Sequence, residues 1–334
     1  MTAYDPIPEL EKLGYTEREA AFLYLVGMHS GYFLRRQFLT FVKREDGAMV
    51  QRFLQKTVAF GHVVPMEYAA GRHIYHLKSK LVYRLLGQED SQSRRLKGDR
   101  EIKTRLMQVD YLVDHFGEKF LDTAAEKVAF FQEKLNVKTD SLPQASYRDH
   151  GTACYFPDRF PIAVSDKPGQ TAPLVTFVFL DDGLRSLSAF TRWLEQYAPL
   201  LNALQLAEVV YTSDNSRNFA GAEREFLRRF PPSSVTSELP FGLEHFLDWL
   251  RIRTRYDREE GRFSLAELRI LKEGERAYTC LEKQAMLAGW KLGSVRESIL
   301  RERFEREMRQ ISIRGYLLEH DYPVWSMKYR RSVL

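Results

Sequence analysis

Apolar residues recur at helical spacing through the first sixty positions of the chain. The sequence Thr16-Glu17-Arg18-Glu19 has the form of a capping box, and the apolar stripe behind it predicts a helix from Glu17 to about His29. A Ser-Gly pair ends that helix, and four apolar residues at helical spacing predict a second, short helix within 34–42. A third helix is expected at 46–60.

The third helix has one apolar and one polar face. Val50, Phe53, Leu54 and Val58 are predicted to face inward. The residue types on the opposite face are those that reach base edges or phosphates when a helix lies in the major groove, and they are Gln51, Arg52, Gln55 and Lys56. We therefore take it as a candidate recognition helix, although a solvated amphipathic helix would show the same pattern.

After Gly61 the hydrophobic period changes from helix to strand. Residues 62–68 and 72–77 read as two strands, joined by a turn at Ala69-Ala70-Gly71. Three helices followed by a hairpin with a basic tip is the order of a winged helix, which predicts a DNA-binding domain at 7–90. In that arrangement Arg72 and His73 contact the sugar-phosphate backbone.

Positive charge is concentrated in this part of the chain. The whole sequence carries a net charge of +5, whereas the stretch from Tyr32 to Arg105 has sixteen basic and seven acidic residues, so the remainder is slightly acidic. A local excess of this kind indicates a polyanion partner, here double-stranded DNA, with a solvated basic face as the alternative. The predicted DNA-binding residues are Arg35, Arg36, Gln51, Arg52, Gln55, Lys56, Arg72, His73, Arg94 and Arg95.

Residues 94–140 are predicted to form connecting helices. The first of them begins with six basic residues and has apolar positions at helical spacing up to Phe116. It would extend the DNA-binding face across further phosphates, or serve as an exposed linker helix. The stretch from Phe120 to Leu135 continues helical, and the sequence around Pro143 marks the next boundary.

Strands and helices alternate between 145 and 235, which predicts a small α/β domain. The expected strands are 151–156, 160–164, 175–180 and 206–212, and the expected helices are 190–204 and 221–230. The third of these strands is nearly all apolar and is therefore expected to be buried.

Acidic residues stand at the ends of these strands, where a metal site could form. Asp158 opens one strand, and Asp181 with Asp182 ends the buried one; such carboxylates can hold Mg²⁺ against a phosphate. The arrangement resembles the PD-(D/E)xK nuclease superfamily, but no lysine stands two positions after either acid of the pair. We therefore expect a non-cleaving domain without a metal cofactor. In the alternative, a Mg²⁺-dependent nuclease, Arg185 or Lys167 would replace the lysine.

Three short motifs extend the resemblance beyond this one domain: Pro157-Asp158, Leu180-Asp181-Asp182-Gly183 and Trp193-Leu194-Glu195-Gln196-Tyr197. Together with the winged-helix order, they resemble the replication-relaxation family over about residues 15 to 215. The resemblance implies a protein of plasmids or other mobile elements that binds a DNA site as a transcriptional regulator or as a replication or mobilisation factor.

The C-terminal region, 240–334, is predicted to be helical. Helices are expected at 243–254, 265–271 and 278–290, and a long charged helix at 295–313 has Ile299, Phe304, Met308 and Ile311 spaced for one narrow seam. Such a seam favours a homodimer, with packing on the chain's own middle domain as the alternative. The aromatic and basic tail at 322–331 is expected to dock on the core.

Composition narrows the function classes further. The apolar runs are far too short to span a membrane, and the start of the chain lacks a secretory leader, so we expect a cytoplasmic protein. Two cysteines cannot form a structural zinc site by themselves, and no nucleotide-binding, metalloprotease or serine-hydrolase motif occurs, so no small-molecule substrate is indicated. The expected fold class is α+β; an adaptor that uses its winged helix to bind another protein is the non-DNA alternative.

Overall fold

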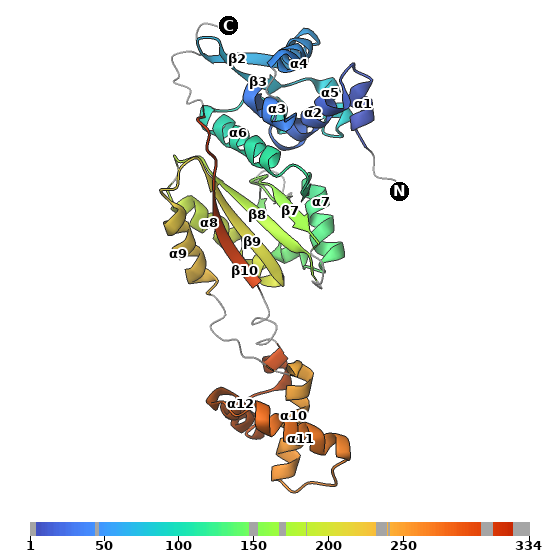
Figure 1. Ribbon diagram of the computed structural model, residues 1–334, viewed down its shortest axis with the longest axis vertical. Coiled ribbons are helices and arrows are strands. Elements are labelled where there is room, and N and C mark those ends of the chain that lie inside the picture. Colours follow the sequence, from blue (N-terminus) through green and yellow to red (C-terminus); the bar gives the residue numbers. More distant parts are fainter. Residues whose placement is uncertain are drawn as a thin grey trace. The chain divides into compact units, whose positions relative to one another are not determined.

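The computed structural model describes residues 5–43, 47–146, 153–166, 172–184, 186–231, 239, 241–301 and 310–322. The fold is mixed α+β (Figure 1). The chain divides into two compact units, of which unit 1 is Met1–Arg229 together with Ile311–Leu334 and unit 2 is Phe230–Gln310.

Unit 1 begins with a helical region that contains a small sheet. The capping box at Thr16 is formed: the Glu19 amide donates to Thr16 Oγ1, and the Thr16 amide donates to the Glu19 carboxylate. The predicted helix from Glu17 to His29 is thereby confirmed. The elements are α1 (Ile7–Glu11), α2 (Glu17–His29), β1 (Tyr32–Leu34), α3 (Arg35–Phe41), α4 (Gly47–Ala59), β2 (Val63–Ala69), β3 (Arg72–Leu77) and α5 (Lys80–Leu85).

The predicted hairpin is present and gains a third strand. β3 pairs antiparallel with β2 and, on its other edge, with β1, so that the order is β1-β3-β2. The sequence did not indicate β1, because three residues are too few to show a strand period. The core beside this sheet is aromatic, with Phe22, Phe33, Phe38 and Phe53 in mutual ring contact.

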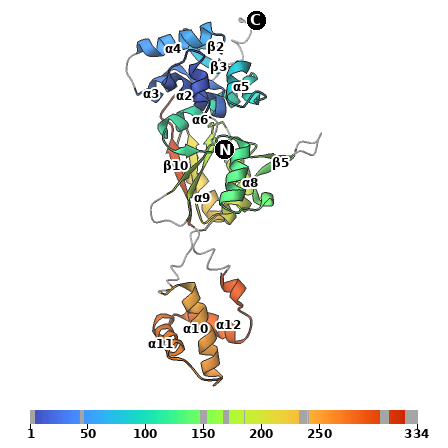
Figure 2. The same cartoon turned by 90° about the vertical axis from the view of Figure 1, so that its right-hand side faces the viewer.

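The helix expected to connect domains is instead a core element. α6 (Asp99–Asp114) contacts α2, α3 and β1 on one side and β8 on the other, and Figures 1 and 2 both show it between these groups. Every residue from Ile102 to Val113 is buried. From Ile102 onward α6 is therefore not the exposed linker helix that the sequence suggested as one reading.

A mixed five-stranded sheet forms the second layer of unit 1. Its order is β10-β9-β8-β7-β4; β8 pairs antiparallel with β7 and parallel with β9, and α8 connects the two parallel strands. The strands are β4 (Lys119–Phe120), β7 (Ile162–Ser165), β8 (Leu174–Asp181), β9 (Leu206–Ser213) and β10 (Gln310–Leu317), and the helices are α7 (Ala124–Ala129), η2 (Phe130–Lys134), α8 (Ser188–Ala203) and α9 (Phe219–Arg229). The short η1 (Gln92–Arg94) and η3 (Thr139–Ser141) lie in connections, and β5 (Gln144–Ser146) pairs with β6 (Ala153–Tyr155) apart from the large sheet.

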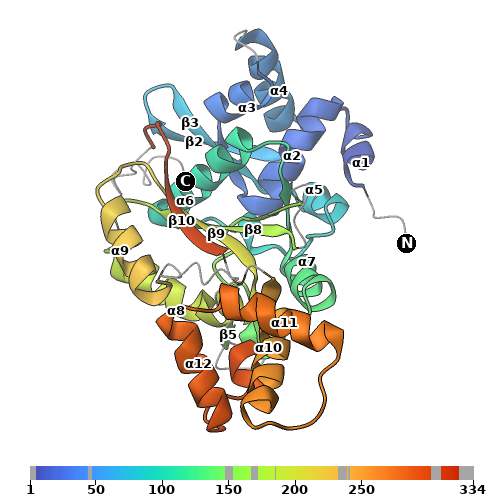
Figure 3. The same ribbon diagram turned by 60° about the horizontal axis from the view of Figure 1, so that its bottom comes forward.

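Two sequence predictions fail at the edges of this sheet. Phe120 was expected to be helical, but it lies in β4 and pairs with Ala163 of β7. The helix starts at Ala124, after the Thr123 cap. The seam helix at 295–313 does not exist in the predicted form, since Ile311 lies in β10, beside β9 (Figure 3). Phe304 and Met308 lie outside the described residues. The homodimer prediction thus loses the helix on which it was based.

Unit 2 is helical as predicted, with α10 (Gly242–Asp257), α11 (Leu265–Ala277) and α12 (Leu281–Lys291) around Trp249. A Cβ on Gly274 would lie 2.0 Å from the Trp249 ring, so glycine is what allows α11 to pack this closely on α10. Among the helices described in both units, none has a stretch long and apolar enough to cross a bilayer.

Candidate functional site

The outer face of α4 presents three of the four side chains predicted to read bases. Gln51, Arg52 and Gln55 are exposed, and the opposite side of the helix is buried in the aromatic core. Val58, predicted to face inward, is 38% exposed, because Thr57 takes the buried position in that turn. The exposed face is polar and carries one positive charge.

Lys56 does not belong to this face. Its Nζ lies 2.6 Å from Glu19 Oε2, donates to the Gly14 carbonyl at 3.0 Å and sits over the Tyr15 ring. The lysine therefore fastens α4 to the start of α2. Helical spacing alone placed Lys56 on the same face as Gln51 and Arg52. That spacing could not show its partners, which lie about forty residues earlier in the chain.

The tip of the β2–β3 hairpin places Arg72 in solvent and leaves His73 half-buried. Gly71 adopts a φ of 69° in the turn, and its amide donates to Glu67 at 2.9 Å. In Figures 1 and 2 the hairpin and α4 lie at the same end of unit 1, away from the five-stranded sheet.

Arg35 lies between α4 and the hairpin. A Cβ on Gly47, the first residue of α4, would come within 2.6 Å of Arg35 Nη2, so the guanidinium packs against the first turn of that helix. Burial raises the pKa of Tyr75 in β3, and the nearby charge of Arg35 opposes this rise. Arg35 is exposed and makes no ion pair within the described residues, so its charge extends the face formed by α4.

The other predicted arginines are engaged or lie elsewhere. Arg36 was expected to point outward, but its guanidinium donates twice to the buried Asp110, at 2.5 and 2.8 Å. Arg94 donates to the carbonyls of Glu89 and Lys78. Arg95 is exposed, next to η1.

The fold pairs half of the sixteen basic residues in the stretch from Tyr32 to Arg105 with acids. Eight basic residues between 32 and 105 form ion pairs, several of them with acids outside that stretch: Arg36, Lys56, Lys80, Arg84, Lys97, Arg100, Lys103 and Arg105. Within the described residues, six others are exposed without an ion pair: Arg35, Lys43, Arg52, Arg72, Lys78 and Arg95. The charge available to a polyanion is therefore smaller than the sequence suggested.

The candidate metal ligand Asp181 is a buried acceptor. It is 2% exposed, Oδ2 accepts from the Tyr211 hydroxyl at 2.6 Å and from Asn218 Nδ2 at 3.0 Å, and Oδ1 accepts from the Gly183 amide. Burial and the bond to Asp181 raise the pKa of Tyr211 well above its usual range. The phenol stays protonated and acts as a donor.

Asp182 and Asp158 are also held by protein donors. Asp182 is fully buried and pairs with Arg100, whose Nε lies 2.6 Å from Oδ2. Asp158 accepts from Trp193 Nε1 at 2.8 Å and from the Phe160 amide at 3.0 Å. Each of these carboxylates thus accepts at least two hydrogen bonds from the protein.

No three His, Cys, Asp or Glu side chains converge on a possible metal position in the described part of the chain. Arg185 and Lys167, which the nuclease alternative required, lie outside it. Asp181 ends β8 and Asp182 follows it, whereas Asp158, expected to open a strand, lies in the turn between β6 and β7.

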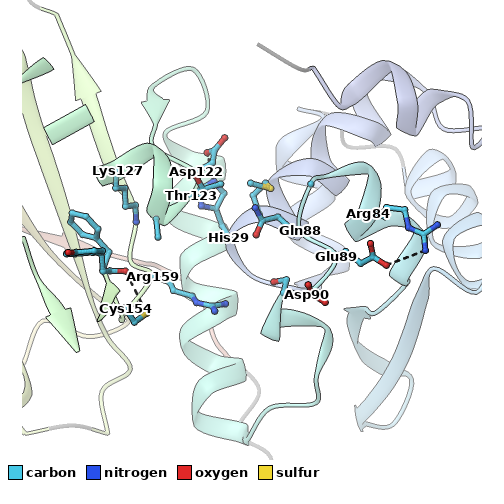
Figure 4. Close-up of a pocket in the computed structure, with 16 residues that line it drawn as sticks. His29, Arg84, Gln88, Glu89, Asp90, Asp122, Thr123, Lys127, Cys154 and Arg159 are labelled. Atoms are coloured by element: carbon cyan, nitrogen blue, oxygen red, sulfur yellow. Dashed lines mark hydrogen bonds and ion pairs between the residues drawn. The ribbon is translucent and has the colours of Figure 1, made fainter. Parts of the chain in front are cut away.

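Sequence reasoning missed a polar pocket of about 560 Å³ in unit 1, drawn in Figure 4. On one wall, Asp122 accepts from His29 Nε2 at 2.9 Å and from the Tyr24 hydroxyl. Burial disfavours the ionised form of Asp122, but these two bonds outweigh it and lower its pKa. His29 and Asp122 are 93 residues apart, and no local pattern links them.

Lys127 lines the same pocket from α7. Its side chain is 4% exposed, its Nζ donates to the Phe160 carbonyl at 2.7 Å, and burial lowers its pKa to about 8. In Figure 4, the Arg159 side chain extends from the wall near Cys154 toward the wall near Asp90. The pocket therefore combines basic and acidic groups in one cavity.

Comparisons with family models, curated proteins and solved structures find no match to this chain.

Proposed function

We propose that residues 7–90 form a winged-helix module that binds double-stranded DNA at a specific site. The observation that carries this proposal is the exposed face of Gln51, Arg52 and Gln55 on α4, flanked by Arg35 and by the hairpin tip at Arg72. A helix of this kind enters the major groove while the hairpin lies along the backbone.

The side chains on α4 suit base recognition better than general attraction to phosphate. Glutamine forms paired hydrogen bonds with adenine, and arginine does so with guanine. Neither Arg52 nor Gln55 has to give up a strong intramolecular bond on binding, because both are exposed and the described residues offer Arg52 no carboxylate partner. We therefore assign specificity to α4, and orientation on the duplex to Arg35 and Arg72.

The mobile-element role suggested by the replication-relaxation resemblance is part of this proposal. Its motifs at 157–158, 180–183 and 193–197 lie in the turn before β7, at the end of β8 and in α8, apart from the exposed face of α4. We propose that the chain acts as a regulator or as an accessory factor of replication or mobilisation.

The first prediction concerns Arg52→Ala combined with Gln55→Ala. A duplex selected from a random pool by the full-length protein is expected to bind this double variant at least about thirtyfold more weakly, since two lost base contacts of about 1–3 kcal/mol each remove at least about 2 kcal/mol. Arg72→Ala is expected to weaken all duplexes equally and to reduce the slope of log K against log salt by about 1. Fluorescence anisotropy at several salt concentrations measures both effects.

Arg224→Ala is the matched control, because it removes the same charge from an exposed position of α9 in the same unit. It is expected to leave affinity and salt slope unchanged. If selection enriches no sequence, or if the α4 double variant binds the selected duplex as tightly as the unmodified protein, the proposal is wrong.

A further inference from the structure

A second pocket of unit 1 lies along the first turns of α6, distinct from the α4 face. Its volume is about 580 Å³, and the loop 157–160 forms its opposite wall. Four basic and two acidic side chains line it: Lys97, Arg100, Arg105, Arg159, Glu101 and Asp158. The pocket therefore has an excess of positive charge.

The two acids have partners other than Arg159. Glu101 lies 3.4 Å from both Lys97 Nζ and Arg105 Nη2. Asp158 accepts from Trp193 and from the Phe160 amide. No carboxylate in the described part of the chain lies within ion-pair distance of Arg159, so its guanidinium remains available.

Arg159 and Arg105 both line this pocket, and Arg159 also lines the neighbouring pocket that contains Lys127. Arg105 is 8% exposed; burial lowers its pKa, and the charge of Arg159 lowers it further. Glu101 lies 3.4 Å from Arg105 and offsets part of this repulsion, whereas the described residues give Arg159 no carboxylate partner.

The backbone that presents Arg159 is strained as well. Phe156 and Arg159 have φ angles of 51° and 60°, in the left-handed region that favours glycine. Gln108 Nε2 donates to the Arg159 carbonyl at 3.2 Å, and Lys127 donates to the Phe160 carbonyl. The loop is thus fixed from two helices in a conformation that costs stability, as is common at binding sites.

We propose that this pocket binds a small phosphate-bearing anion, with Arg159 as its principal ligand and Arg105 and Arg100 contributing positive potential. A guanidinium pairs with two phosphate oxygens at once, and the volume admits a group of nucleotide size. The site does not depend on DNA binding by α4.

The experiment titrates inorganic pyrophosphate into the full-length protein by calorimetry at constant ionic strength and compares Arg159→Gly. Saturable binding at one equivalent is expected, weakened about tenfold or more in the variant. Glycine relieves both the left-handed strain and the repulsion, so the melting temperature of the variant without ligand is expected to stay the same or rise by about 2 °C. Arg224→Ala is the control and is expected to bind pyrophosphate normally.

Unchanged pyrophosphate affinity in Arg159→Gly would overturn the proposal, as would the absence of saturable binding to the unmodified protein. A second titration, with duplex DNA in place of pyrophosphate, distinguishes a small anion from a nucleic-acid backbone as the source of the phosphate. If Arg159→Gly loses affinity for duplex DNA while pyrophosphate fails to bind, Arg159 contacts a nucleic-acid backbone and the small-anion site is wrong. Failure of the α4 variants to affect DNA binding has no bearing on this titration.

Discussion

Asp181→Ala is expected to lower the free energy of unfolding of unit 1 by about 3 kcal/mol, because it leaves one buried and two part-buried donors without an acceptor. Those donors are the Tyr211 hydroxyl, Asn218 Nδ2 and the Gly183 amide. Asp181→Asn keeps one side-chain oxygen and is expected to lose less. Urea unfolding followed by circular dichroism measures the difference.

The same experiment separates a structural acid from a catalytic one. A carboxylate kept for metal binding is usually strained or poorly paired, so its removal leaves stability unchanged or raises it. Asp166→Ala, an exposed acid just after β7, serves as the control and is expected to fall within about 0.5 kcal/mol of the unmodified protein. A midpoint for Asp181→Ala equal to that of this control would contradict the structural role.

Local signals in the sequence predicted local structure well. The capping box at Thr16 places the start of α2 at Glu17, and the turn at Gly71 separates β2 from β3 as expected. Both predictions are correct because the interactions that define a capping box and a tight turn lie within four residues along the chain.

Long-range pairing explains what the sequence did not reveal. β4 and β10 are edge strands of the middle sheet, and β10 follows an 81-residue unit that separates it from β9. Ile311 and Ile313 alternate with exposed residues in a strand period, but the charged stretch before them favoured a helix. Over a stretch of only a few residues, the apolar positions of a helix seam coincide with those of a strand, so the pattern does not distinguish the two.

Long-range pairing also explains why the basic stretch from Tyr32 to Arg105 was misjudged as a surface. Arg36, Arg100 and Lys103 counted toward a cationic surface, yet their partners Asp110, Asp182 and Asp214 come from outside that stretch. Pairing with these acids turns such residues from candidate DNA ligands into members of ion pairs. Arg52 and Arg72, in contrast, were placed correctly in solvent because helix and hairpin periods determine which side they occupy.

Lys127→Met is expected to stabilise unit 1 by about 2 kcal/mol at pH 7. The ammonium group is buried, with no carboxylate within ion-pair distance among the described residues, and its pKa falls to about 8 from an ordinary value of 10.5. That lowering corresponds to about 3 kcal/mol, and loss of the hydrogen bond to the Phe160 carbonyl offsets about 1 kcal/mol. Lys134→Met, on an exposed position of η2, is the control and is expected to change stability by less than about 0.5 kcal/mol.

The pH dependence gives this prediction its sharpest test. Below pH 8 the lysine is protonated in both the folded and the unfolded state, so the burial cost is fully present. Between pH 8 and 10.5 the folded protein releases the proton while the unfolded chain keeps it, and the unmodified protein therefore gains stability as pH rises. The advantage of Lys127→Met is expected to be largest at pH 7 and to shrink toward pH 10.5. Urea midpoints for both proteins at pH 7, 8, 9 and 10 measure it, and a constant difference would show that Lys127 does not titrate in this window.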